Sequence, residues 1–334
     1  MTTQDVEARR IPAAELLGNH WLAGAPLTLD EARGSVLLLL FWDYSCVHSL
    51  RVLATVRQWH RRYAECGLLV AGVHVPKFPF GRDHATVETA VHGMAPGFPV
   101  VMDNEALIAS RYGIRTVPAL VLVDAGGFVR FRAEQEGNEE DVEHALQALL
   151  HEAGRCEELP LPVLASRGRG FRLRGTPDLL TGYQGGSLGN VEGYSPESVV
   201  AYRDPGIYFE GRFYAAGEWL NERTAMVAAA GDGQIIADCE ALQVHAVMEH
   251  PGGTRAVTVR QDDAFLTEET RGEDVRIGPD GRSYCLVEEP RSYHLVRNPA
   301  HNRHVVRIDT GGPGVRVYGV TFVAGNLPDA VMNN

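Results

Sequence analysis

The stretch "FWDYSCVHSL" places Cys46 between an apolar run and the start of an amphipathic pattern, with His48 and Ser49 just after it. This order predicts a buried strand, a short turn and a helix that begins at Cys46. Unpaired N–H groups and the helix dipole stabilise an anion there, so the pKa of this thiol is expected to lie well below that of a free cysteine. A protonated His48 adds positive charge beside it, and Lys77, the only lysine of the chain, does so too if it points inward. These residues predict a nucleophilic thiolate.

The other cysteines offer Cys46 no static partner. Cys66 lies at the far end of the same predicted helix, roughly 30 Å away at about 1.5 Å per residue, whereas a disulfide needs Cα atoms within ~7 Å. Cys156 is the least excluded, while Cys239 and Cys285 lie in apolar strands and are expected to be inert packing. An odd, scattered set is not expected to form a disulfide framework, which agrees with a reducing compartment.

Alternating strand and helix patterns surround the Cys46 segment. Helical spacing runs from residue 47 to 63, and residues 67–75 read as the next strand. Asp83 is a plausible N-cap for a following helix. A hairpin and an amphipathic helix with an acidic first turn then lead to Gly154. Residues 1–154 therefore predict an α/β domain.

The second half of the chain has a different texture. Residues 155–198 are rich in Gly, Pro and Arg and are expected to form an ordered connector. From residue 199 to 334, many short alternating segments separated by turns predict an all-β antiparallel sandwich.

Composition excludes several classes of partner. The chain has 334 residues, 45% of them hydrophobic, which fits two domains. A net charge of -12 argues against nucleic acid and anionic membrane as partners. No window of ~20 apolar residues is present to span a membrane. The first twenty residues lack a hydrophobic signal core, so a cytoplasmic location is expected.

Four segments of the first half carry a resemblance to the TlpA/DipZ-like branch of the thioredoxin fold, over roughly residues 15–153. They are "WLAGAPLTLDEARGSVLLLLFW", "FWDYSC", "GVHVPKF" and "TVPA", the last containing Pro118 where this family has a cis-proline. DipZ-type proteins, which are bacterial, also carry a C-terminal domain like a carbohydrate-binding module, a jelly-roll-like sandwich. "RGTPDLLTGY", "GEWLNERTA" and "PRSYHLVRN" are similar to its landmarks. Relatives in this branch are often extracytoplasmic.

Three departures from the family pattern bear on activity. The family's Cys-x-x-Cys is Cys-Val-His-Ser here, Leu40 stands where thioredoxins place a buried acid, and Lys77 replaces a glutamate. The first two agree, because that acid helps deprotonate the second cysteine. DsbA-type oxidants share the histidine of the motif. Without a second thiolate to release a mixed disulfide, the resemblance implies a monothiol oxidoreductase-like site. Its expected partners are thiol-containing proteins or low-molecular-weight thiols.

The candidate partner-contacting residues are Trp42, Tyr44, His74, Lys77, Val117 and Pro118. The resemblance implies that the backbone at Val117 and Pro118 pairs with a bound strand, as cis-proline loops do. The peptide between these two residues is therefore expected to be cis. Trp42 and Tyr44 are expected to be walls of the site, and His74 also fits an ordinary core or surface histidine.

Other functions stay open on the sequence alone. A one-cysteine peroxidase of the AhpC/TSA type would oxidise Cys46 to sulfenic acid, but no Pro-x-x-x-Thr-x-x-Cys pattern precedes it. A redox-inactive two-domain binding or scaffold protein is the non-enzymatic alternative. Cys46 and His48, with His74, lack the paired spacing of structural zinc, so no metal and no cofactor are expected.

Aromatic residues of the second domain raise one further ligand. A sugar could stack on them, although aromatic side chains on strands are usually core. The residues concerned are Tyr208, Tyr214, Trp219, Tyr293 and Tyr318.

Overall fold

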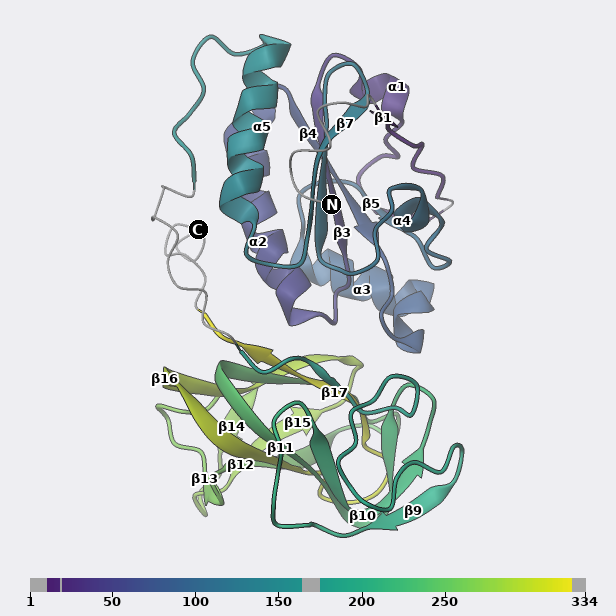
Figure 1. The fold of residues 1–334 in the computed structure, drawn as a ribbon, viewed down its shortest axis with the longest axis vertical. Helices are drawn as coiled ribbons and strands as arrows, with labels where there is room; N and C mark the ends of the chain where they lie inside the picture. The colour runs from purple at the N-terminus through teal and green to yellow at the C-terminus, as the bar shows by residue number, and fades with distance from the viewer. Residues whose placement is uncertain (1–10, 19, 164–174, 326–334) are drawn as a thin grey trace. The chain divides into compact units, whose positions relative to one another are not determined.

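The computed structural model describes residues 11–18, 20–163 and 175–325 of the chain. These residues form two compact units, and the chain passes from the first to the second between residues 163 and 175 (Figure 1). The middle of the predicted connector, residues 164–174, lies outside the described residues. So do residues 1–10, on which the expected location partly depended, and residues 326–334.

The first unit alternates strands and helices. In chain order its elements are β1 (Ile11–Pro12), β2 (Trp21–Ala23), α1 (Leu29–Ala32), β3 (Val36–Trp42), α2 (Val47–Tyr63), η2 (Ala64–Cys66), β4 (Leu68–His74), η3 (Pro79–Arg82), α3 (His84–Met94), β5 (Val100–Met102), α4 (Leu107–Arg111), β6 (Ala119–Val123), β7 (Phe128–Glu134) and α5 (Glu139–Ala153). The strands form one sheet in the order β1-β7-β6-β3-β4-β5-β2. β3, β4 and β5 run parallel, and β6 and β7 are antiparallel. The predicted thioredoxin-like fold is confirmed.

β3 is the centre of this unit because every one of its residues is buried. Its even-numbered residues Leu38, Leu40 and Trp42 belong to a core shared with α2, α3 and α5. Its odd-numbered residues belong to the core on the opposite face, which α1 and α4 cover. Helices on both faces explain why β3 is a continuous apolar run rather than an alternating one.

The helix that carries the site is the one the sequence predicted. α2 spans Val47–Tyr63 and lies beside α5 on one face of the sheet (Figure 1). The predicted cap of α3 is also present, because the Asp83 carboxylate accepts a hydrogen bond from the Thr86 N–H at 2.8 Å. A long helix and a fully buried strand thus hold the segment around Cys46 between them.

The second unit is all-β. Its strands are β8 (Leu179–Leu180), β9 (Val199–Tyr202), β10 (Phe213–Asn221), β11 (Met226–Glu249), β12 (Arg255–Gln261), β13 (Ala264–Phe265), β14 (Val275–Ile277), β15 (Ser283–Val287), β16 (Arg291–Asp309) and β17 (Arg316–Val323). All pairings between these named strands are antiparallel. One apolar cluster extends from Leu179 to Phe322 and forms the core. The predicted all-β fold of this half is confirmed.

The aromatic residues considered for sugar stacking lie mostly inside this unit. Tyr214, Trp219, Tyr293 and Tyr318 are each at most 4% exposed. Tyr208 is half-buried and its hydroxyl donates to the Asp204 carboxylate at 2.6 Å. The sugar platform built on these five residues is therefore wrong, because four of them have no face at the surface.

Candidate functional site

Strand register brings the predicted site segments to one end of the first sheet. This end, where β3 and β4 finish and β6 begins, is called the Cys46 edge. Trp42 ends β3 opposite His74, which ends the parallel strand β4, so the loops after both strands start at the same edge. β6 is antiparallel to β3 and Ala119 lies opposite Phe41, so Pro118 reaches that edge as well. The loop before α2, the loop after β4 and the proline loop thus share one end of the sheet.

Cys46 is the N-cap of α2. Its N–H donates to the Asp43 carbonyl oxygen at 3.1 Å, and its carbonyl accepts from the Leu50 N–H at 3.1 Å. The residue is only 6% exposed. The sulfur therefore sits at the predicted helix terminus, under a nearly closed surface.

Burial raises the pKa of the Cys46 thiol above its ordinary value. Lys77 and hydrogen bonds from Ser49 act to lower it, and the negative charge of Asp43 acts to raise it further. The prediction of a lowered pKa is wrong, because it counted the helix terminus and omitted desolvation of the thiolate. The protonated thiol is the resting form at neutral pH.

Asp43 organises this loop, and its role was not expected from the sequence. It is fully buried, and its Oδ1 accepts from both the N–H and the hydroxyl of Ser45 at 2.6 Å. Its Oδ2 accepts from the Lys77 N–H at 2.5 Å. One carboxylate thus joins the loop before Cys46 to the loop after β4. An acid directly after an apolar strand was the available signal.

Ser49 occupies the place of a second motif cysteine and is fully buried. Its Oγ accepts from the Asp43 N–H at 3.2 Å. Its own N–H and hydroxyl favour the Cys46 thiolate. Ser49 therefore supports the one sulfur that the motif retains.

His48 contacts Glu136, and the structure does not show it beside the Cys46 sulfur as predicted. Its Nδ1 lies 2.8 Å from Oε2 of Glu136, and Arg51 Nε lies 2.5 Å from the other oxygen of that carboxylate. Burial would raise the pKa of Glu136, but the hydrogen bonds from His48 and Arg51 hold it below its ordinary value. The structure places His48 in this ion-pair cluster, while the charges that act on the Cys46 thiol include Lys77 and Asp43.

Three predicted contact residues are buried together. Trp42, Tyr44 and His74 are at most 2% exposed. The His74 ring stacks on Tyr44 at 5.7 Å and meets Trp42 edge-on at 5.9 Å. Among the described residues neither ring nitrogen of His74 has a hydrogen-bond partner, and burial lowers its pKa. These three side chains pack beneath the loop, and they are too buried to contact a partner.

The proline loop is ordered by its neighbours. The Val117–Pro118 peptide is cis, as predicted. The Pro118 carbonyl accepts from the Gln135 N–H at 2.8 Å. The Glu134 carboxylate accepts from the Thr116 N–H at 3.3 Å and from its hydroxyl at 3.1 Å. Within the described residues, no hydrogen bond engages the N–H or C=O of Val117, which is half-buried.

Lys77 is exposed, whereas Cys46 and Ser49 are buried. The Lys77 ammonium group lies 5.7 Å from the centre of the Phe78 ring. Because its N–H is held by Asp43, the base of this side chain is fixed to the Cys46 loop.

Cys66 and Cys156 form a disulfide, with Cα atoms 4.9 Å apart, and they lie 90 positions apart in sequence. The expectation of no disulfide is therefore wrong. The chain after α5 returns to the far end of α2, and this return is invisible in cysteine spacing. The pairing also answers the question of Cys156, which is joined to Cys66 and not to Cys46. The other cysteines, Cys46, Cys239 and Cys285, are free and buried.

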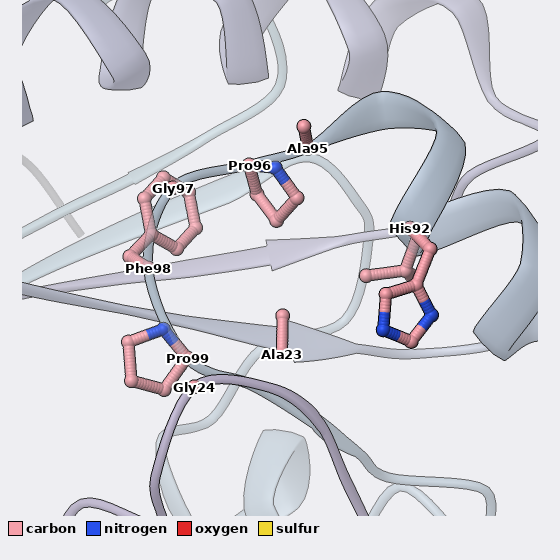
Figure 2. A pocket seen from close by; sticks show the side chains of 9 residues that line it. Ala23, Gly24, His92, Ala95, Pro96, Gly97, Phe98 and Pro99 are labelled. Atoms are coloured by element: carbon pink, nitrogen blue, oxygen red, sulfur yellow. The ribbon is translucent and has the colours of Figure 1, made fainter.

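An apolar pocket of about 340 Å³ lies at the opposite edge of the first sheet. It is lined by the end of α3, the segment leading into β5 and part of β2, and Figure 2 shows Pro96, Phe98 and Pro99 on its wall. Because β5 is parallel to β4, the start of β5 is remote from the Cys46 edge. The pocket is thus separate from the thiol site.

Two features are absent from the described residues. No group of three or more His, Cys, Asp or Glu side chains there is arranged to hold a metal ion. None of the helices in that part of the chain is both long and apolar enough to cross a membrane.

Family comparisons agree with both halves of the chain. Residues 8–132 match the AhpC/TSA family, and residues 176–322 match the family described as "Thioredoxin like C-terminal domain". Protein DipZ of Mycobacterium bovis is 29% identical over 250 residues, which cover 71% of this chain and 34% of DipZ. The chain thus spans about a third of the length of that relative.

Two further similarities each cover less than half of this chain. The thiol-disulfide oxidoreductase ResA of Geobacillus thermodenitrificans is 24% identical over 128 residues, covering 38% of this chain and 71% of ResA. A solved structure of a putative thiol:disulfide interchange protein DsbE from Chlorobium tepidum is 21% identical. It covers 42% of this chain and 96% of its own, with a TM-score of 0.37. This chain thus combines a match to the AhpC/TSA family with a match to the thioredoxin-like C-terminal domain family, and its similarity to DipZ supports the DipZ-like thioredoxin family.

Proposed function

We propose that the first domain is a monothiol exchange site, at which Cys46 forms a mixed disulfide with a low-molecular-weight thiol or a thiol-containing protein. The observation that carries this proposal is that the motif has a cysteine, Cys46, at its first position and a serine, Ser49, at its last. The sulfur stands at the N-cap of α2, and the residue in the second motif position is a hydrogen-bond donor to the thiolate. Ser49 thus favours the anion of one sulfur, and the motif supplies no second one.

The exchange step balances with an external disulfide. The Cys46 thiol loses its proton to solvent, and its thiolate attacks one sulfur of glutathione disulfide. The sulfur–sulfur bond of glutathione disulfide breaks, a bond from Cys46 to one glutathione forms, and the other glutathione leaves and takes up a proton. A second external thiol reverses the step, because no neighbouring thiolate is available to do so.

The raised pKa of Cys46 makes this exchange slow in the resting protein. Only the thiolate is nucleophilic, and burial keeps its population small at neutral pH. Lys77 favours the thiolate and reaches the surface, so an approaching anionic thiol such as glutathione meets a positive charge at the site.

The proline loop supports docking of an extended partner at the same edge. The N–H and C=O of Val117 make no hydrogen bond within the described residues. Glu134 and Gln135 form hydrogen bonds with Thr116 and Pro118, the residues on either side of Val117. The loop is therefore already ordered, and binding a partner costs little conformational entropy. Extended peptides bind to proteins through main-chain hydrogen bonds to a free N–H and C=O of this kind.

A redox-inactive binding protein is the second candidate. The observation that favours it is the 6% exposure of Cys46 together with its raised pKa. The same observation counts against a one-cysteine peroxidase, which needs a thiolate ready to attack peroxide.

Intact mass after incubation with glutathione disulfide, at pH 7.5 and pH 9, separates these candidates. The wild type should gain one glutathione, faster at the higher pH, and Cys46→Ser should gain none. Peptide mapping assigns the adduct. If Cys46 stays unmodified at both pH values while the protein remains folded, the exchange proposal fails and the binding role is favoured.

A further inference from the structure

Residues 155–163, here called the strap, follow α5 and lie against the first unit. The far end of the strap is fixed by Glu143, a side chain only 1% exposed. Its Oε1 accepts from the Val163 N–H at 2.6 Å and from the Tyr63 hydroxyl at 2.8 Å. The Val163 side chain joins the core formed by α2 and α5. This end of the strap is held by a buried carboxylate.

The middle of the strap is held by two side chains of the same helices. Gln147 on α5 donates to the Pro160 carbonyl at 2.9 Å. Arg62 on α2 donates to the Leu161 carbonyl, while the Leu161 side chain itself is 82% exposed. These are single polar contacts near the surface, so they are weaker than the attachment at Val163.

The near end of the strap is held by the disulfide. Cys66 ends η2 and is 4% exposed, whereas Cys156 is only half-buried. Arg155 lies against Gly67, whose φ of +92° closes η2, and donates to the Ser35 hydroxyl at 2.5 Å. The disulfide is thus the covalent attachment of the strap to the body of the domain.

The surroundings also suit the reduced pair. The Glu158 carbonyl oxygen lies 3.2 Å from Cys156 Sγ, so a thiol at this position has a hydrogen-bond acceptor within the strap itself. Cys66 is nearly covered, and a small free thiol is well tolerated in such an apolar environment.

We propose that Cys66–Cys156 is a reversible thiol–disulfide site, separate from Cys46, at which low-molecular-weight thiols act on Cys156 and thereby release the near end of the strap. A thiolate attacks the more accessible sulfur of Cys156, the bond to Cys66 breaks, and Cys66 leaves as a thiolate that takes up a proton. A second thiol then displaces Cys156 from the mixed disulfide. Overall, one protein disulfide and two thiols give two protein thiols and one external disulfide.

The test uses the full chain carrying Cys46→Ser, so that chemistry at Cys46 does not enter. The oxidised protein is incubated with reduced glutathione under native conditions, alkylated and analysed by peptide mass. Amide hydrogen exchange is measured before and after. We expect labelling at Cys66 and Cys156, and at least a tenfold faster exchange of the Gly154 amide, which hydrogen-bonds at the end of α5 beside the near end of the strap, with β3 unchanged. The variant Cys66→Ser/Cys156→Ser should show the fast exchange without glutathione.

Two results would overturn the proposal. One is a disulfide that glutathione reduces only after the protein is unfolded, which would make it a permanent cross-link. The other is complete reduction with no change at Gly154, which would show that the near end of the strap stays in place without the disulfide. Each result is independent of whether Cys46 exchanges thiols, because the tested chain lacks that sulfur.

Discussion

Asp43 Oδ2 accepts a hydrogen bond from the Lys77 N–H at 2.5 Å, and this bond ties the loop before Cys46 to the loop after β4. The tie has two opposed effects on the thiol. It fixes the base of Lys77, whose charge favours the thiolate, while the Asp43 charge disfavours it. The geometry of the site and the reactivity of its sulfur therefore depend on the same carboxylate.

Asp43→Asn is expected to weaken the fold and activate the thiol. An asparagine Nδ2 in place of one oxygen faces an N–H donor and cannot accept from it, which costs about 2 kcal/mol of unfolding free energy for a buried group. Removing the negative charge lowers the pKa of Cys46, so alkylation by iodoacetamide should become faster at a given pH. Urea unfolding and alkylation rates check both effects.

Asp83→Asn is the matched control, because Asp83 also accepts from a backbone N–H but caps α3. It should reduce stability without speeding the reaction of Cys46. Unchanged or slower alkylation in Asp43→Asn would contradict the charge argument.

The pH dependence of Cys46 alkylation should reveal its raised pKa directly. The midpoint is expected above the value of about 8.5 typical of free cysteine. Lys77→Met removes a positive charge that favours the thiolate, so its midpoint should lie higher still and its rate at pH 8 should fall several-fold. A midpoint below that of a free thiol would show that the helix terminus outweighs burial after all.

The sequence predicted elements well and the thiol environment poorly. α2 and the cap of α3 depend on local patterns, apolar spacing and a side chain next to its own helix, and both were found as expected. The local sequence does not reveal the role of Asp43, which lies between Trp42 and Tyr44. Its partners include Lys77, 34 positions away, and only the fold brings them together.

The two corrections at cysteines share a physical origin. The Cys46 pKa depends on how closely other segments cover the sulfur, and periodicity in one segment carries no measure of that. The Cys66–Cys156 pair likewise depends on the chain returning after α5 to the end of α2, across 90 residues. Long-range burial and chain return are tertiary properties, so a local motif could not supply them.

Ser49→Cys is expected to create a dithiol that the parent lacks. The substitution gives the first turn of α2 a Cys-x-x-Cys pair, so oxidation should join Cys46 to the new thiol and insulin reduction should appear. Loss of the Ser49 oxygen as acceptor for the Asp43 N–H should cost about 1 kcal/mol. Activity assays with Ser49→Ala as control test this. A well-folded but inactive variant would indicate that Leu40, in place of the family's buried acid, also blocks the reaction.

His74→Phe is expected to remove part of the pH dependence of folding. Burial lowers the pKa of His74, so it stays neutral in the fold while the unfolded chain binds a proton below about pH 6.5. The unfolded state then binds more protons, and the free energy of unfolding falls as the pH falls through that region. The contribution of one such group approaches about 1.4 kcal/mol per pH unit. Phenylalanine keeps a flat ring between Trp42 and Tyr44 and binds no proton.

Urea unfolding at pH 7.5 and pH 5.5 measures this difference. His74→Phe should be more stable than wild type at both pH values, because it also removes two buried ring nitrogens that have no partner among the described residues, and its advantage should grow at the lower pH. His84→Gln, which alters an exposed histidine at the start of α3, should leave the wild-type slope intact. Parallel losses of stability in wild type and His74→Phe would mean that the buried imidazole finds a proton or a partner in the fold, and would restore His74 as a candidate for proton transfer at the thiol site.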